Sequence, residues 1–464
     1  MARIPSNALT RLLLAAHGAL AALTVDVEDA DSVKAAAALV AEDLMSFYDG
    51  DEPGNTIGLL PMPPAGDYYW WTGGALWGGL LDYRNRTGET KYDDTISQSL
   101  LWQVGPNDDF LSPNWTTSIG NDDQAIWALS ALSAEEIGFQ EPGPDEPQWL
   151  TLAKNVFDEQ SSGDRRVKDG ECEGALRWQI FTFNNGYNYV NSASNIGYFN
   201  LAAQLAYLTG NETYLSAAGD TWSVLTDIGF VAENFDVYDG ASAEDCAKVN
   251  NAQFSYTAAM LLQGSAYLYN HTGGDQGWKT RIDGLVDSVL STFFPDGVAF
   301  EIACERIKSC TTDMHFFKGL THKYLASTMQ LAPYTAAKLL PVLKSSAKAA
   351  AAQCTGGDNG RMCGFQWSSG KFDGTTGAAQ QLSVLSALAS IMPAQGTVAS
   401  TAPSNSTGSG SGSGSGNGSG SGSDSESAQN STSGDQPAGN NMGAQASVSL
   451  GALVGSLLLG SLLM

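Results

Sequence analysis

Apolar residues recur at the spacing of an α-helix along most of the chain from Ser32 to Ile391. Ser32–Phe47 is the first such segment. Three later segments end on a glycine, a residue that commonly caps the C-terminus of a helix, and these phrases are Leu81–Gly88, Leu205–Gly210 and Tyr267–Gly273. A polar turn and a second amphipathic segment follow each phrase. The pattern predicts an all-α chain of repeated helical hairpins.

Hairpins of this kind cannot bury their apolar faces alone, so they either stack as an open solenoid or close into a ring. Loops rich in glycine, aromatic and amide side chains precede several of the predicted helices, and they are Asp67–Trp77, Thr117–Gln124, Phe183–Asn195 and Asn250–Tyr256. The loops would converge on one face only if the ring closes. The pattern alone leaves both arrangements open.

Asp122 and Asp123 are adjacent carboxylates at the mouth of a predicted helix, for which Asn121 or Asp122 suits the N-cap position. Neighbouring helix side chains point about 100° apart, so the two carboxyl groups can reach different edges of one sugar. Glycoside hydrolysis needs one ionised and one protonated carboxyl group, and a separation of roughly 5 to 5.5 Å favours the retaining mechanism. Repulsion between the two groups would raise the pKa of one of them.

Two other interpretations of this pair remain open from the residues alone. Both carboxylates could simply complement the helix dipole as an acidic N-terminal turn. A calcium loop is a second alternative, but the regular Asp-x-Asp-x-Asp-Gly spacing of such a loop does not follow. The catalytic interpretation gains its support from the rest of the chain.

The composition narrows the classes of function. The 464 residues have a formal net charge of −26, which disfavours a nucleic-acid partner and suits an acidic, extracellular setting. The four histidines, His17, His271, His315 and His322, lack zinc-site spacing and give no basis for a Ser-His-Asp triad. Neither standard phosphate-binding glycine pattern is present. We therefore expect no metal and no cofactor.

The two ends of the chain carry targeting signals. Residues 1–24 combine two arginines, an apolar run and the small-residue cleavage sequence Ala19-Leu20-Ala21, which predicts a secretory signal peptide. A globular domain of residues 25–393 would follow. Residues 394–441 are a Ser/Gly-rich tether with nothing to bury. Residues 442–464 match a GPI-attachment propeptide, and the expected anchor residue is Gly439, Asn440 or Asn441.

Cysteines and sequons agree with export. Six cysteines suit an oxidising compartment, and short spacing suggests Cys304–Cys310 and Cys354–Cys363, which leaves Cys172–Cys246. Asn-x-Ser/Thr sequons, which would mark surface loops, occur at Asn85, Asn114, Asn211 and Asn270. We expect a secreted monomer held by lipid at the outer face of the plasma membrane and in the cell wall.

Further candidate substrate-binding residues lie in the loops before the helices. Tryptophans there could stack on sugar rings, although clustered aromatics more often serve a core. Amide and phenol groups suit neutral polyols, although Asn and Tyr also build ordinary turns. A carboxylate near the last helix either caps that helix or faces the sugar. The candidates are Trp70, Trp71, Gln124, Asn191, Asn195, Tyr256 and Asp373.

Taken together, five motifs resemble glycoside hydrolase family 76, specifically its GPI-anchored fungal members that are similar to mannan endo-1,6-alpha-mannosidases. The resemblance covers roughly Val25 to Pro393. Its motifs are Tyr69-Trp70-Trp71 with the glycines that follow, Asn121–Gln124, Tyr189–Asn195, Cys304–Lys318 and Phe372–Gly377. Val190, Thr257 and the pair Met314-His315 depart from the family pattern and bear on the details of the sugar subsites.

The resemblance implies an (α/α)6 toroid with its site in a groove at one end, and a retaining reaction on α-mannosides. It implies Asp122 as the nucleophile and Asp123 as the acid/base. The donor would be α-mannan or the mannose core of a GPI glycan, and wall glucan would be the acceptor if transfer outcompetes hydrolysis.

Two other functions are compatible with such a fold. A wall-bound mannan-binding protein could keep the groove without turnover, although the intact Asp pair argues against this. A hydrolase or lyase for uronic acids would need a basic groove to hold its polyanionic substrate. The candidate loops are poor in Arg and Lys.

Overall fold

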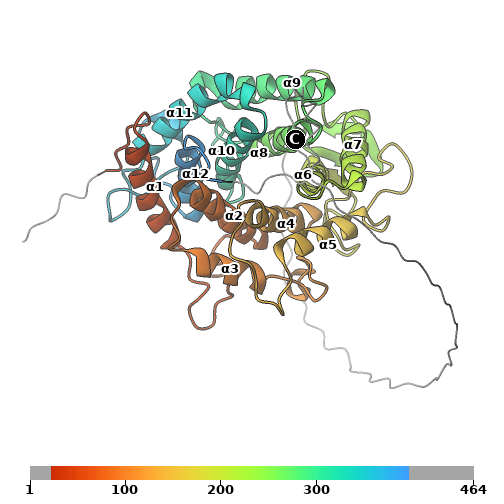
Figure 1. The fold of residues 1–464 in the computed structure, drawn as a ribbon, viewed down its shortest axis with the longest axis horizontal. Coiled ribbons are helices and arrows are strands. Elements are labelled where there is room, and N and C mark those ends of the chain that lie inside the picture. The colour runs from red at the N-terminus through yellow and green to blue at the C-terminus, as the bar shows by residue number, and fades with distance from the viewer. Residues whose placement is uncertain (1–21, 397–464) are drawn as a thin grey trace, which may run out of the picture. The chain divides into compact units, whose positions relative to one another are not determined.

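The computed structural model describes residues 22–396, and six of its helices form a closed inner ring (Figure 1). Each inner helix packs against the next, and the last packs against the first. In chain order they are α2 (Trp70–Thr87), α4 (Asn121–Glu136), α6 (Ser192–Thr209), α8 (Ser255–His271), α10 (Met314–Leu331) and α12 (Ala378–Ser390). The hairpins therefore close into a ring, and the expected all-α toroid is confirmed.

Six further helices lie outside this ring. They are α1 (Ala30–Met45), α3 (Asp93–Trp102), α5 (Trp149–Ser161), α7 (Glu212–Asp227), α9 (Gln276–Phe293) and α11 (Ala336–Ala352). The helices α3, α5, α7 and α9 each pack against the inner helix that precedes them, whereas α1 and α11 both pack against α12. Four short 3₁₀ helices lie in the connections, at Pro113–Trp115, Pro295–Gly297, Pro333–Thr335 and Trp367–Ser369.

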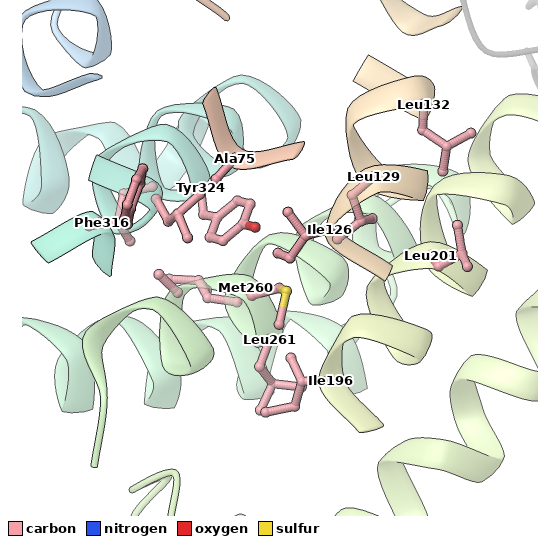
Figure 2. Close-up of a cluster of buried hydrophobic side chains, with 14 of the residues drawn as sticks. Ala75, Ile126, Leu129, Leu132, Ile196, Leu201, Met260, Leu261, Phe316 and Tyr324 are labelled. Carbon is pink, nitrogen blue, oxygen red and sulfur yellow. The ribbon is translucent and has the colours of Figure 1, made fainter. Parts of the chain in front are cut away.

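Burial explains why the two sets of helices differ in sequence. Nearly every residue of α6 is buried, so its apolar residues surround the helix instead of forming one stripe. In α9 the buried residues Trp278, Ile282, Leu285 and Val289 repeat at helical spacing on one face. Side chains of the inner helices meet at the middle of the ring, among them Ile126 and Met260 (Figure 2).

The helix α2 begins earlier than the sequence suggested, because the glycine-rich stretch expected to be a loop is helical from Trp70 onward. Glycine inside a helix normally costs stability. Here it allows a close approach, since a Cβ atom on Gly73 would lie 2.5 Å from the Gly58 carbonyl oxygen and 2.8 Å from Trp127 Cζ2. The contact between α2 and α4 therefore requires the absence of a side chain.

A small antiparallel sheet, which the sequence did not predict, lies before α6. Its strands are in the order β1 (Tyr189–Asn191), β2 (Gly240–Ser242) and β3 (Asp245–Asn250). Asn191 pairs with Gly240 and is followed directly by the first residue of α6. The sheet thus fixes the entry to an inner helix.

The three predicted disulfides, Cys172–Cys246, Cys304–Cys310 and Cys354–Cys363, are all confirmed. The sequons lie less uniformly in loops than expected, since Asn85 and Asn270 belong to α2 and α8. Asn114 lies in a 3₁₀ helix and Asn211 caps α7.

Residues 1–21 of the predicted signal peptide, and the tether and anchor signal from residue 397 with Gly439, Asn440 and Asn441, lie outside the described residues. Within residues 22–396, none of the helices combines the length and apolar character needed to cross a membrane.

The close contact at Gly73 yields a stability prediction. Gly73→Ala should lower the free energy of unfolding by ~1–3 kcal/mol, because the added methyl group overpacks the contact between α2 and α4. Gly219→Ala in α7 is the matched control, since a Cβ there meets nothing within 4 Å, and it should raise the same quantity by about 0.5–1 kcal/mol. Urea unfolding measures both changes. Equal effects of the two substitutions would contradict the packing argument.

Candidate active site

A cavity of about 660 Å³ opens at the end of the ring where the inner helices begin. The first turns of α2, α4, α6, α8 and α10 all contribute to its lining. Ile126 and Met260 line it from the side of the apolar cluster in Figure 2 and so form its floor. Among the described residues that line the cavity, Asp122, Asp123 and Asp313 are carboxylates and none is Lys, Arg or His.

Asp122 and Asp123 lie side by side on the first turn of α4. The N-cap is Gly120, not Asn121 or Asp122 as expected, because the Asp123 carboxylate accepts the Gly120 N–H at 2.7 Å and completes the cap. Asp122 Oδ1 accepts the Asp123 N–H at 3.0 Å, and its Oδ2 accepts the Asn191 side-chain amide at 2.9 Å. The two carboxyl groups therefore have different hydrogen-bond partners.

Burial and these hydrogen-bond partners give the carboxyl groups of Asp122 and Asp123 different pKa values. Burial raises the pKa of Asp122 to about 6, against the opposing hydrogen bonds from Asn191 and the Asp123 N–H. Burial and then the charge of Asp122 hold the pKa of Asp123 well above its usual range. Asp122 is thus the more acidic of the two groups, and its charge favours the protonated form of Asp123. One ionised and one protonated carboxyl group is the arrangement that glycoside cleavage requires.

Asn191 is held in place by the fold around it. Its Oδ1 accepts the Ser194 N–H at 3.1 Å and so caps α6. Its backbone carbonyl accepts the Asn195 amide at 2.8 Å, and Asn195 also bonds both backbone groups of Leu176. Asn195 is buried and does not line the cavity. The two asparagines form a support for Asp122.

Trp71, Tyr256 and Asp313 line the cavity beside the catalytic candidates. The Trp71 indole N–H donates to Asp313 Oδ1 at 2.9 Å, which joins α2 to the start of α10. Burial raises the pKa of Asp313. The Tyr256 ring stacks on Phe317 with 4.2 Å between centroids. Burial, followed by the charges of Asp122, Asp239 and Asp313, holds the pKa of Tyr256 well above its usual value, so its hydroxyl stays protonated.

Three other expected substrate-binding residues have different surroundings. Trp70 lines the cavity, but its indole N–H donates to Gln103 at 2.8 Å and its ring stacks on Trp127. Gln124 is buried and donates to Glu159 at 2.8 Å, because its position on the first turn faces α5. Asp373 accepts the Phe365 and Gln366 N–H groups and so closes its own loop. Neither Gln124 nor Asp373 lines the cavity.

Sequence reasoning missed several residues of this lining. Asp313 lay in a quoted motif but was not proposed for the site. Its position at the head of an inner helix matches that of the Asp pair and could have indicated it. Tyr69, Trp178, Gln179, Asn184 and Asn185 also line the cavity. Within the described part of the chain, no group of three or more His, Cys, Asp or Glu side chains could hold a metal ion.

Comparison with known proteins agrees with this geometry. The family model for glycosyl hydrolase family 76 matches residues 32–403. The chain belongs to glycosyl hydrolase family 76. It is therefore a glycoside hydrolase, as the resemblance implied.

Three relatives illustrate the family. The mannan endo-1,6-alpha-mannosidase DCW1 of Saccharomyces cerevisiae is 40% identical over 78% of this chain and 80% of its own length. The crystal structure of Dfg5 from Chaetomium thermophilum in complex with glucosamine is 46% identical, with a TM-score of 0.76 over 79% of this chain and 91% of its own. An alpha-1,6-mannanase of Salegentibacter is 17% identical, with a TM-score of 0.62 over 78% and 99% of the two chains, and shares the fold.

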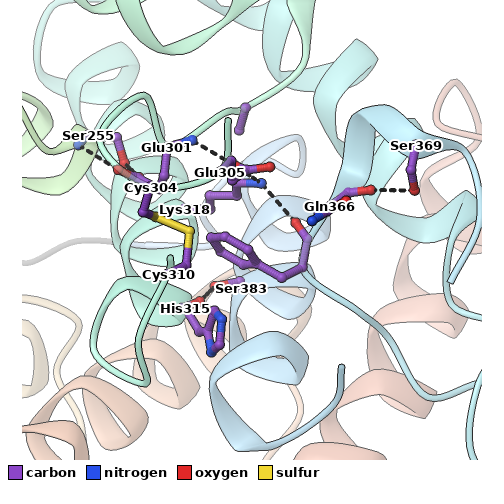
Figure 3. A network of polar contacts seen from close by, with 12 residues as sticks. Ser255, Glu301, Cys304, Glu305, Cys310, His315, Lys318, Gln366, Ser369 and Ser383 are labelled. Atoms are coloured by element: carbon purple, nitrogen blue, oxygen red, sulfur yellow. Dashed lines mark hydrogen bonds and ion pairs between the residues drawn. A yellow bond between two sulfur atoms is a disulfide. The ribbon is translucent and has the colours of Figure 1, made fainter. Parts of the chain in front are cut away.

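A buried polar network holds two sides of the family-76 site (Figure 3). Lys318 pairs with Glu305 at 2.5 Å and donates to the Phe365 carbonyl at 2.8 Å. Glu301 accepts the N–H and hydroxyl of Ser255, the residue before Tyr256. Burial raises the pKa of Glu301 to about 7. The network holds the start of α8 in place. Because the Cys304–Cys310 disulfide closes the same loop, the network also positions the segment that leads to Asp313.

The hydrogen bond from Asn191 yields a prediction on pH dependence. Asn191→Ser keeps a capping hydroxyl for α6 but is too short to reach Asp122. Loss of the bond raises the pKa of Asp122, so the acid limb of the kcat/KM profile should move up. The shift should be about one pH unit, since a hydrogen bond to a charged group contributes ~1.5 kcal/mol or more.

The control for this shift removes a cap elsewhere in the molecule. Asp275 caps α9 by accepting the Trp278 N–H at 3.1 Å. Asp275→Ala should lower stability and leave the pH profile in place. If Asn191→Ser folds and keeps the wild-type acid limb, then Asn191 does not set the acidity of Asp122.

Proposed function

We propose that the protein is a retaining endo-α-1,6-mannosidase in which Asp122 is the nucleophile and Asp123 the acid/base. The observation that carries the proposal is the unlike hydrogen bonding of two adjacent, half-buried carboxyl groups in a cavity whose described lining has no Lys, Arg or His. The name of the S. cerevisiae relative supports the substrate class. Further support comes from the mannanase of the same fold, whose complex with α-1,6-mannotriose was obtained with an inactive variant that has two consecutive Asp changed to Asn.

The first step of the proposed reaction breaks the glycosidic bond. The Asp122 carboxylate attacks the anomeric carbon while Asp123 gives its proton to the departing oxygen, so a glycosyl ester forms on Asp122. Asp123 is then ionised. It takes a proton from water or from a sugar hydroxyl, which attacks the same carbon and releases Asp122. Two displacements at one carbon retain its configuration.

The side chains around the pair suit this sequence of steps. The Asn191 amide and the Asp123 N–H bind Asp122 most strongly when it is charged, which favours the carboxylate needed for attack. Ionisation of Asp122 in turn favours the protonated form of Asp123. Trp71 and Tyr256 offer aromatic surface, and Asp313 offers a hydrogen-bond acceptor, to the bound sugar.

Variants of the pair test these roles. Asp122→Ala should lower kcat/KM on every α-mannoside donor by at least about 10⁴-fold, because no glycosyl ester can form. Asp123→Ala should cost roughly 10²–10⁴-fold on mannan. It should cost much less on a donor whose leaving group needs no proton, and added azide should accelerate that reaction.

Proton NMR of the first product tests the stereochemistry. The retaining mechanism predicts that an α-linked donor first yields the α anomer. An inverted anomer would require a water between the two carboxyl groups and would refute both assignments. Wild-type turnover by Asp122→Ala would refute Asp122 as the nucleophile, whereas absence of turnover by the wild-type protein on every donor would favour the alternative of a non-catalytic mannan-binding protein.

We further propose that the natural donor is a GPI-core glycan and that the mannosyl group passes to wall glucan. Glucosamine in the complex of the Chaetomium relative is compatible with a donor that contains an amino sugar. The carboxylates of the cavity suit such a cationic group. Incubation with GPI-core glycans should yield a mannosyl-glucan product when glucan is added. Free mannoside as the sole product would leave hydrolysis as the activity.

The two ends of the chain support a location for this enzyme outside the cell. The predicted signal peptide of residues 1–24 and the predicted C-terminal propeptide of residues 442–464 would place the enzyme outside the cell on a lipid at Gly439, Asn440 or Asn441. Names of the relatives refer to mannan, a wall polymer, and support this setting. A phosphatidylinositol-specific lipase should release the protein from membranes. Recovery of the peptide 450–464 in the membrane fraction would exclude the anchor.

A further inference from the structure

The outer face of α3 carries a feature that the active site does not use. All eleven tryptophans of the sequence lie within residues 22–396, and ten of them are buried or half-buried. Trp102, the last residue of α3, has 60% of its surface exposed. An exposed tryptophan presents a large apolar ring to water, and such residues are common in binding sites.

The helix α3 lies on the outside of the ring (Figure 1). Trp102 belongs to a row of side chains on its outer face. The inner face of α3 packs on the core and contains the buried residues Ile96, Ser99 and Leu100. The positions Asp94, Ser97, Gln98, Leu101 and Trp102 follow one another at helical spacing on the other face. At 1.5 Å per residue, this row extends for about 12 Å along the helix.

The row forms one wall of a shallow hollow of about 480 Å³. Gln140 and Glu146, from the segment after α4, form the other wall. The Gln140 amide donates to the Asp93 carbonyl at 3.4 Å, and Glu146 accepts the Gly143 N–H at 2.9 Å, so the second wall is held in place. The volume falls within the ~300–1,000 Å³ typical of small-ligand sites.

The side chains of the helix wall are free to bind. Within residues 22–396, Asp94, Ser97 and Gln98 make no side-chain hydrogen bond or ion pair, and the Trp102 ring contacts no other ring or cation. These groups offer hydroxyl, amide and carboxylate partners next to one aromatic face. Sugars present the matching surface, since hydroxyl groups surround rings whose C–H faces can stack on an aromatic ring.

Charge and polarity select among the candidate ligands. The hollow has two carboxylates and no cation, and the chain has a net charge of −26, so an anionic polymer would be repelled. A protein partner would need a larger apolar core than Leu101 and Trp102 provide. A neutral polymer rich in hydroxyl groups would not be repelled and would not need a large apolar core.

We propose that this hollow, with Trp102 at its centre, is a second carbohydrate-binding site for a neutral hexose polymer such as α-mannan or β-glucan. Its residues are distinct from those that line the catalytic cavity. The adjacent residue Gln103 accepts the indole N–H of Trp70, a cavity residue, so Trp102 lies toward the end of the ring that carries the cavity. A polymer held there would keep the enzyme beside further substrate or acceptor chains.

The test measures polysaccharide binding by the full chain in an Asp122→Ala background, with the cavity saturated by α-1,6-mannotriose. Affinity electrophoresis in gels that contain α-mannan or β-1,3-glucan should show retardation of the parent protein by at least one of them. Trp102→Ala should weaken the association by at least about tenfold. Gln98→Ala should weaken it less, and Trp102→Phe should keep most of it.

The controls separate this site from the catalytic one. Tyr334→Ala removes a partly exposed ring from the 3₁₀ helix Pro333–Thr335, which does not line the hollow, and should leave the retardation unchanged. In the active enzyme, Trp102→Ala should keep the wild-type kcat/KM on a short soluble mannoside. This binding assay does not depend on the roles assigned to Asp122 and Asp123, so failure of either proposal is distinguishable from failure of the other.

Two outcomes would overturn the proposal. The first is equal retardation of the parent protein and Trp102→Ala in both gels, or no retardation of either. The second is loss of a wall-protein contact in Trp102→Ala with polysaccharide binding unchanged, which would make the hollow a protein-docking surface.

Discussion

Close approach of the six inner helices is the constraint on which the rest of this structure depends. Five of the six contacts between neighbouring inner helices have a glycine where a Cβ atom would come within 3.0 Å of the adjacent helix. At those positions an added side chain would force the adjacent helix or its side chains to shift, and a core at native density tolerates little overpacking. The pairs, from α2 round to α12 and back, are Gly74–Trp127, Gly197–Ala125, Gly264–Phe199, Gly319–Ser383 and Gly79–Leu382.

Closure of the ring has an electrostatic consequence at its open end. The first turns of the inner helices meet there, so backbone N–H groups and helix dipoles point toward the cavity and favour negative charge. Burial opposes that charge and raises the pKa of both Asp122 and Asp123. The balance falls differently for the two residues because Asn191 donates to only one of them. Two chemically identical side chains thereby differ in acidity, as the proposed retaining mechanism requires.

The loops around the cavity gain their rigidity from polar groups buried beside it. Lys318 and Glu305 are removed from water, and an ion pair in such a place contributes little net stability. Loss of one partner would leave a buried charge, so the pair strongly favours one arrangement of its loop. Figure 3 shows that this loop also carries the Cys304–Cys310 disulfide and lies beside Ser255. Burial of the two ions therefore adds little stability, but it holds the loop beside the cavity in one conformation.

The sequence by itself determined the features that depend on neighbours along the chain. Helical spacing and the glycines at Gly88 and Gly210 predicted the hairpins, and both glycines adopt the left-handed conformation at the helix ends. Short spacing predicted two of the disulfides and left the third pair. The adjacent carboxylates were placed on a first helical turn for the same local reason, and α4 begins there.

Tertiary structure alone decided which side chains share the cavity. Trp71 and Asp313 are 242 positions apart, and no local pattern shows that they bond. Gln124 follows Asp123 directly, yet one step of about 100° turns it from the cavity to Glu159. Asn195 was expected to bind sugar, but it supports Asn191 from within the core. Contacts of this kind depend on ring closure, which the spacing of residues along the chain allowed but did not specify.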